Sequence, residues 1–326
     1  MSRKRSTNSR GGALLAVLWL SAALAAIAFS VATTVRGEIE RASTLSESMR
    51  THYLAAGGIE RALLWCRFGS RGGPQLSLDV PRMDFDFPAG RAIVEVIPET
   101  ARLDINRAQP QALMALALAL GADPLRAEEI AVAIVHWRSP GAGPLDAYYL
   151  GLGPTFRPRH ASVQDVEELL YVKGMTPDLF HGNYVRDAAG RLVRLGAFKD
   201  CVSPWGSVDQ FDVNTVEPAL MVAAGVAPEA ARQIAGMRRI QPVVNEAQLN
   251  QVRAIAGIGA SKLRRGGGNS IYTLRATARL RLPDGRFSDL SKTIAATVKF
   301  APQGSPRPYY ILRWDETATS EVSQWR

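Results

Sequence analysis

The side chains that could bind a metal are few and far apart in this sequence. The candidates carry the nitrogen and sulfur atoms that zinc prefers, and they are His136, His160, His181 and Cys201. Their spacing matches no compact ligand pattern, and nothing in the sequence brings the four together. The sequence also contains no Gly-x-Ser-x-Gly elbow, no phosphate-binding loop and no His-Glu-x-x-His motif. We therefore expect no zinc centre and no catalytic site, in a protein that is not an enzyme.

A glycine turn has the residue types that bind phosphate. Gly257-Ile258-Gly259 would expose backbone N–H groups, and the cations Lys262, Arg264 and Arg265 follow it. Residues 104–268 contain 17 basic and 16 acidic residues, however, and a surface that binds duplex nucleic acid should carry a larger excess of positive charge. We interpret the cations as a charged connecting loop and keep nucleic-acid binding as an alternative.

The glycine turn belongs to an internal repeat. Leu103-Asp104-Ile105-Asn106 recurs as Phe211-Asp212-Val213-Asn214, 108 residues later, and each copy precedes two predicted helices. We expect two helical units, at about 103–175 and 211–265, within an all-α segment 103–268. The asparagine and aspartate of each copy are expected to cap a helix and to favour its positive N-terminus. The repeated unit resembles a helix-hairpin-helix fold.

Strands are predicted on both sides of these repeats. Residues 91–98 read as one strand before them, and 271–282, 291–300 and 309–314 read as strands after them, with a turn at Pro283-Asp284-Gly285. The repeats therefore interrupt a domain that contains a sheet. We predict an α+β fold in which a long N-terminal helix packs on an antiparallel sheet and a large all-α segment is inserted.

The predicted first helix has an apolar seam. Its members recur every three or four residues, which places them on one side of a helix, and they are Leu45, Met49, His52, Ala56, Ile59 and Leu63. The seam could pack on the protein's own sheet or on sister subunits, and both can hold along different stretches.

A membrane span is predicted at the N-terminus. Residues 11–35 contain no charge, and a helix of that length covers about 37 Å, more than the hydrocarbon core of a bilayer. The alternative is a secretory signal peptide with a cleavage site near 22–28. Of the net charge of +9, four positive charges lie in residues 1–10, and the remainder of the chain is at +5. These charges would hold the N-terminus in the cytoplasm and place the soluble part in the periplasm.

The start of the chain resembles the leader of type IV pilins and pseudopilins. Arg10-Gly11 stands directly before Gly12-Ala13-Leu14-Leu15. The resemblance implies a leader at 1–11, cleavage after Gly11 by the prepilin peptidase, N-methylation of Gly12 and a transmembrane helix at 12–35. Pilins usually have a glutamate at the fifth mature residue, and here that residue is Ala16.

The order of motifs resembles one subfamily, general secretion pathway protein K, the largest minor pseudopilin of type II secretion. The matching motifs are Ile105-Asn106, Ala133-Ile134, Trp137-Arg138, Tyr148-Tyr149, Glu168-Leu169-Leu170, Val172, Gly174-Met175 and Val213-Asn214-Thr215. The subfamily has a helical domain inserted in its pilin domain, which here would comprise 36–102 and 269–326. The resemblance implies a single-pass inner-membrane protein that caps the pseudopilus tip and nucleates its assembly, and so supports export of folded proteins.

The same resemblance names the partners. They would be other minor pseudopilins, packing on Leu45, Met49, Ala56, Ile59 and Leu63, together with the prepilin peptidase, the inner-membrane assembly platform and the secreted substrate. The alternatives are a membrane-tethered helix-hairpin-helix protein that binds nucleic acid, and a minor pilin of another type IV filament.

The subfamily is associated with calcium in an acidic loop, but this chain departs from that pattern. Calcium takes about six to eight oxygen ligands. Here His136, Ser139 and Leu145 stand where acids are expected, so that Asp146 remains and Glu167 is a distant second candidate. We expect no cofactor. A disulfide between Cys66 and Cys201 stays open.

Overall fold

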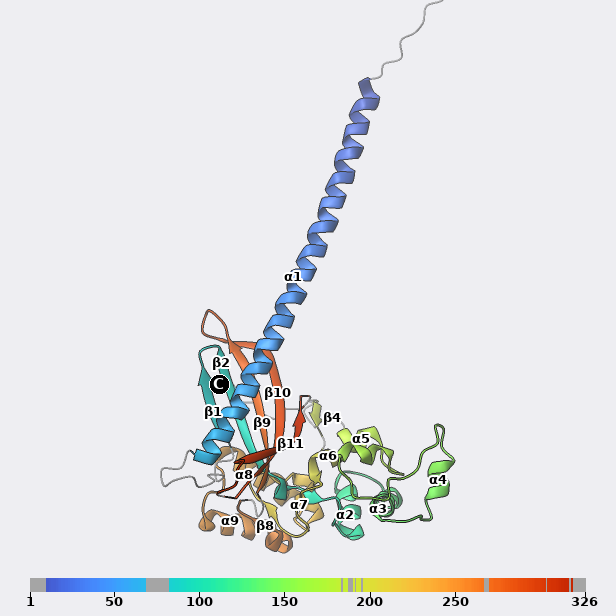
Figure 1. Ribbon diagram of the computed structural model, residues 1–326, viewed down its shortest axis with the longest axis vertical. Coiled ribbons are helices and arrows are strands. Elements are labelled where there is room, and N and C mark those ends of the chain that lie inside the picture. Colours follow the sequence, from blue (N-terminus) through green and yellow to red (C-terminus); the bar gives the residue numbers. More distant parts are fainter. Residues whose placement is uncertain are drawn as a thin grey trace, which may run out of the picture.

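The computed structural model describes residues 10–68, 82–182, 184–186, 190, 192–194, 196–266, 270–302, 304–316 and 318 (Figure 1). Its main sheet and long helix are formed by α1 (Arg10–Phe68), β1 (Arg82–Phe87), β2 (Gly90–Pro98), β9 (Ile271–Arg281), β10 (Phe287–Phe300) and β11 (Tyr309–Asp315). Between β2 and β9 lie η1 (Glu99–Ala101), β3 (Leu103–Asp104), α2 (Pro110–Ala119), α3 (Pro124–Arg138), α4 (Asp146–Leu150), η2 (Val166–Tyr171), α5 (Pro177–His181), β4 (Tyr184–Arg186), β5 (Leu192–Arg194), α6 (Phe198–Cys201), β6 (Val202–Ser203), β7 (Phe211–Asp212), α7 (Pro218–Ala223), α8 (Pro228–Ile240), α9 (Glu246–Ala256), η3 (Gly257–Lys262) and β8 (Leu263–Arg264).

The sheet is antiparallel, in the order β1-β2-β9-β10-β11. Strand β2, from before the helical segment, pairs with β9, from after it, with Ala92 opposite Ala278. Strands β2 and β9 can therefore pair only when the two ends of the helical segment lie side by side. This arrangement confirms the predicted α+β fold of a long helix on an antiparallel sheet.

The C-terminal part of α1 packs on one face of this sheet (Figure 1). Its buried side repeats every three or four residues, at Leu54, Ala55, Ile59, Ala62, Leu63 and Cys66. Gly58 lies on the same side, where an added Cβ would come within 2.8 Å of the Ala92 Cβ, so glycine is what allows the helix to approach the sheet this closely. Ile59 and Leu63 are fully buried here, which corrects the expectation that they pack on a partner: they belong to the protein's own core.

The helical segment has a hydrophobic core of its own, separate from that of the sheet. It lies at the end of the sheet opposite to the free part of α1, and it extends sideways as far as α4 (Figure 1). The molecule is therefore a long stalk, a sheet in the middle and a broad helical mass at the far end.

The two copies of the sequence repeat make the same contacts. The Asn106 Nδ2 donates to the Val163 carbonyl at 2.9 Å and its Oδ1 accepts from the Val163 N–H at 2.7 Å. Asn214 makes the same pair of bonds with Val243, at 3.0 and 2.8 Å. The expected role of both asparagines as helix caps is therefore wrong, because each clamps a loop that comes much later in the chain.

An arginine completes each unit. Arg138 donates to the carbonyls of Ile105 and Ala108. Arg238 donates to the carbonyls of Val213 and Val216, which lie 108 residues after those of Ile105 and Ala108. Each unit is also closed by a short parallel pair, β3 with β6 and β7 with β8. The two units thus share one scheme of bonds, while their identity as helix-hairpin-helix repeats stays a prediction.

Candidate functional site

The free part of α1 is the first candidate surface. A stretch that starts at Gly12 is apolar enough to cross a membrane, and none of its most apolar window is buried in the protein. In the described part of the chain it is the one helix of this kind, and it fits a single-pass membrane anchor for the folded part that follows. Of the predicted leader, residues 1–9 lie outside the described residues, and α1 already begins at Arg10. The predicted cleavage after Gly11 and methylation of Gly12 stay predictions, as does the significance of Ala16.

Beyond the anchor, α1 exposes an apolar stripe that we define as Leu45, Met49 and Tyr53. Leu45 is 66% exposed, Met49 is 49% exposed and Tyr53 is 66% exposed. The three recur every four residues, so they share one side of the helix. Ala56 is half-buried where the helix meets the sheet. The sequence seam thus divides into an exposed stripe and a buried core face, and Tyr53 is the member that the seam did not include.

A buried glutamate joins the sheet to the helical segment. Glu99 follows β2, and its side chain is 1% exposed. Its Oε1 accepts from the Thr273 hydroxyl of β9 at 2.6 Å and from Arg102 at 2.9 Å, and its Oε2 accepts from the Ser203 hydroxyl of β6. The carboxylate therefore hydrogen-bonds to the sheet at β9, to the start of the helical segment at Arg102 and to its middle at β6.

A second connection runs from the last strand to η2. Arg313 of β11 forms ion pairs with Glu167 at 2.8 Å and with Asp165 at 3.4 Å, and these acids contribute to raising the pKa of Arg313 against the opposing effect of its burial. Glu167, the distant calcium candidate, is thus engaged with an arginine. Two links, one buried and one at the surface, fix the helical segment against the sheet.

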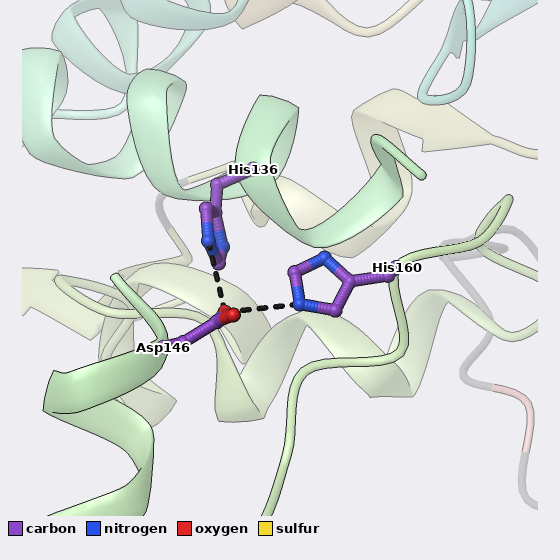
Figure 2. A group of neighbouring side chains, drawn as sticks. All are labelled: His136, Asp146 and His160. Carbon is purple, nitrogen blue, oxygen red and sulfur yellow. Dashed lines mark hydrogen bonds and ion pairs between the residues drawn. The ribbon is translucent and has the colours of Figure 1, made fainter. Parts of the chain in front are cut away.

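Asp146 is surrounded by two of the histidines. Its Oδ1 lies 2.9 Å from the His160 Nε2 and 3.1 Å from the His136 Nε2 (Figure 2). The expectation that nothing brings the histidines together is therefore wrong for His136 and His160. Their spacing does not predict this contact, because the three residues come from the end of α3, the start of α4 and the loop after it.

This environment does not fit calcium. Asp146 is the one carboxylate in the cluster, and its second oxygen, Oδ2, already accepts the Gly143 N–H at 3.1 Å. Burial works against the charge of Asp146, but the Gly143 N–H and the two histidines outweigh it and lower the pKa of the carboxyl. A lone carboxylate between two imidazoles lacks the six to eight oxygens that calcium requires. The other two residues of the set considered for zinc lie elsewhere: His181 makes an edge-to-face contact with Phe180, and Cys201 is buried in the core.

The glycine turn serves packing. An added Cβ at Gly259 would come within 2.5 Å of the Val226 Cγ2, and Gly257 has a φ of +60°, which favours glycine. Lys262 forms an ion pair with Asp209 at 3.2 Å. Packing and backbone conformation thus explain why both positions are glycine, and the cation Lys262 is already paired with Asp209. Nothing here favours the nucleic-acid alternative.

The fold and these surfaces define a class: a membrane-anchored, pilin-like protein with a helical insertion. Residues 94–182, from β2 to α5, match the family described as type II secretion system (T2SS), protein K. Over these residues the chain is similar to protein K of type II secretion, the subfamily that the order of motifs indicated. Protein K is a structural component of the pseudopilus.

The solved structures include a similar chain. It comes from the GspK-GspI-GspJ complex of the type II secretion system of enterotoxigenic Escherichia coli, with 17% identity and a TM-score of 0.44. The likeness covers 87% of this chain and 99% of that one. The comparison with curated proteins gave no match.

Proposed function

We propose that this protein caps the tip of the pseudopilus and nucleates its assembly with other minor pseudopilins. The observation that carries the proposal is the position of the helical segment, which occupies the end of the sheet opposite to the membrane anchor (Figure 1). In a filament that grows out of the membrane, the next subunit towards the tip would have to occupy that end. A subunit whose far end is taken up by a mass of helices can end a filament but cannot continue it.

The α1 stripe supplies the contact with partners. Its three apolar side chains would be left in water in the free protein, and burying them between helices of neighbouring subunits is favourable. The GspK-GspI-GspJ complex joins proteins of this system, and we propose that this chain joins partners of the same kind. Ala16 agrees with the first position in a filament, because a first subunit has no neighbour ahead with which a glutamate could pair.

The anchor sets the place of action. The uncharged start of α1 would span the inner membrane, with the basic residues 1–10 in the cytoplasm and the sheet and helical segment in the periplasm. The prepilin peptidase would cut after Gly11, and the inner-membrane platform would then add subunits beneath this one. At the tip, the helical segment would be the part nearest the outer-membrane channel and the secreted substrate.

Co-purification tests the assembly step. The tagged protein is produced together with the other minor pseudopilins of its own secretion system and extracted in detergent. We expect a complex with the wild-type chain and its loss with Leu45→Glu combined with Met49→Glu, because charge on the stripe is costly to bury. Arg50→Gln, on another side of the same helix, is the matched control and should leave the complex intact. Recovery of the wild-type chain as a free monomer under all mixing conditions would overturn the proposal.

A further inference from the structure

The cluster of His136, Asp146 and His160 is a candidate metal site that the proposed function does not use. Its ligand atoms all lie within 4.8 Å of one another, and Figure 2 shows both imidazole rings directed at the same carboxylate. The distances from the Asp146 Oδ1 to the two Nε2 atoms are 2.9 and 3.1 Å. Ligand atoms about 2.0–2.2 Å from a tetrahedral zinc ion lie about 3.3 Å apart, so the two distances from the Asp146 Oδ1 are close to two edges of such a tetrahedron.

The contact of His160 with Ser139 directs its other ring nitrogen at Asp146. Its Nδ1 lies 3.2 Å from the Ser139 carbonyl oxygen. Because a carbonyl oxygen can only accept, Nδ1 is the nitrogen that donates to Ser139, and Nε2 is the nitrogen that faces Asp146 at 2.9 Å. A carboxylate oxygen and an imidazole nitrogen at this distance share either a proton or a metal ion, and a metal ion would use the Nε2 lone pair. A metal-ligating histidine typically has this same bond from its other nitrogen to a carbonyl.

His136 is a buried polar side chain with no hydrogen bond to satisfy it. It is 9% exposed, and neither ring nitrogen makes a well-aligned hydrogen bond, although Nε2 faces Asp146. Buried polar atoms are nearly always satisfied, and an exception needs an explanation. A metal ion bound at Nε2 would supply a partner for that nitrogen.

The surrounding backbone is shaped around these rings. An added Cβ at Gly143 would come within 2.5 Å of the His136 Cδ2 and Nε2, so glycine lets the loop close over the imidazole. His160 has a φ of +50° and is the one residue other than glycine with a positive φ in the described part of the chain. Strained backbone of this kind is concentrated at binding sites.

We propose that His136, Asp146 and His160 bind one zinc ion, with a water molecule in the fourth position. Two imidazoles and one carboxylate are a donor set for zinc and its neighbours among the transition metals, and they do not suit calcium. The three ligands come from α3, from α4 and from the loop that follows α4. A metal ion there would cross-link residues 139–160 to α3, at the outer end of the helical segment.

Spectroscopy of the full chain tests this site. The protein, in detergent and without a polyhistidine tag, is freed of metal with a chelator and titrated with Co²⁺, whose visible absorption reports four-coordinate binding. We expect one equivalent to bind, Zn²⁺ to displace it because zinc binds such sites more tightly, and excess Ca²⁺ to leave the spectrum unchanged. Zn²⁺, but not Ca²⁺, should also raise the Tm of the metal-free protein.

Variants assign the ligands. Asp146→Asn and His160→Asn should each abolish the Co²⁺ spectrum and the Tm rise, whereas His181→Asn, which removes an imidazole outside the cluster, should keep both. His160→Asn replaces a residue at a positive φ with the residue type that tolerates it, so the fold should survive. Failure of the wild-type chain to bind Co²⁺ or Zn²⁺, displacement of Co²⁺ by Ca²⁺, or retention of the spectrum in His160→Asn would overturn the proposal.

Discussion

Single residues hold the two halves of this molecule together. Glu99 is almost completely buried, yet it is stabilised because an arginine and two hydroxyl groups satisfy its oxygens. The repeat asparagines act in the same manner, each binding one distant peptide group through both its amide atoms. Polar side chains thus define how the helical segment is attached and folded, while apolar ones fill the two cores.

Replacing Glu99 with glutamine tests this attachment. Glu99→Gln keeps the size of the side chain but removes its charge and an acceptor, so we expect a loss of about 1–3 kcal/mol in the free energy of unfolding. Chemical denaturation of the detergent-solubilised chain measures it. Glu128→Gln, an exposed site on α3, is the control and should change stability by less than about 0.5 kcal/mol. Equal stability of the two variants would contradict the role of Glu99.

The two cysteines lie in different cores and are both free and buried. Burial, assisted by Glu217 and Asp200, raises the pKa of the Cys201 thiol well above its ordinary value, which keeps it as the unreactive thiol at neutral pH. We therefore expect no alkylation of the native protein by iodoacetamide, and two alkyl groups after unfolding without a reductant. Mass spectrometry counts the groups, and an unfolded chain that takes none would instead indicate a disulfide.

At the residue level the sequence predicted which polar residues matter, but it did not predict the contacts that they make. It located Asp146 and both copies of the Asp-x-Asn motif, but it suggested local helix capping for asparagines that bond across 57 and 29 residues. The sequence also did not predict that His136 and His160 lie close together, because this depends on the path by which the loop 139–165 folds back onto α3. Contacts of this kind are set by tertiary structure, which local spacing does not encode.

At the level of elements, periodicity was a good guide. The strands expected at 91–98, 271–282, 291–300 and 309–314 correspond to β2, β9, β10 and β11. The edge strand β1 was missed: its alternation of buried Met83 and Phe85 with aspartates is short, and it follows no apolar run. The seam of α1 was recognised, but its division between core and stripe depends on where the sheet ends, which only the fold shows.

Two adjacent glycines of α1 test how the helix meets the sheet. At Gly58 an added methyl would press on the Ala92 Cβ at 2.8 Å, whereas at Gly57 it would meet the Phe87 ring at an ordinary 3.9 Å. Gly58→Ala should therefore destabilise the protein by about 1–2 kcal/mol through overpacking. Gly57→Ala should stabilise it by about 0.5–1 kcal/mol, because alanine is the better helix former. Thermal unfolding of both variants measures the difference, and the same sign for both would contradict the packing described.

For the whole molecule, the order of the anchor, the sheet and the helical segment along its length is the feature that bears on the proposed function. The anchor lies towards one end, the sheet lies in the middle, and the helical segment lies at the other end (Figure 1). In the proposed tip position, such a subunit would offer α1 to the neighbours below it and would direct its helical segment away from the membrane. The sequence predicted the insertion from strands on both sides of the repeats, but its position at the far end of the sheet emerges only from the fold.

The position of the protein in the filament tests the central claim most directly. Pseudopili are overproduced in cells that carry this chain with an epitope inserted in the exposed loop at Gly141, and the filaments are examined by immunogold electron microscopy. A tip cap predicts gold at one end of each filament and none along its length. Gold distributed along the filament would show that the chain stacks on itself and would contradict the account.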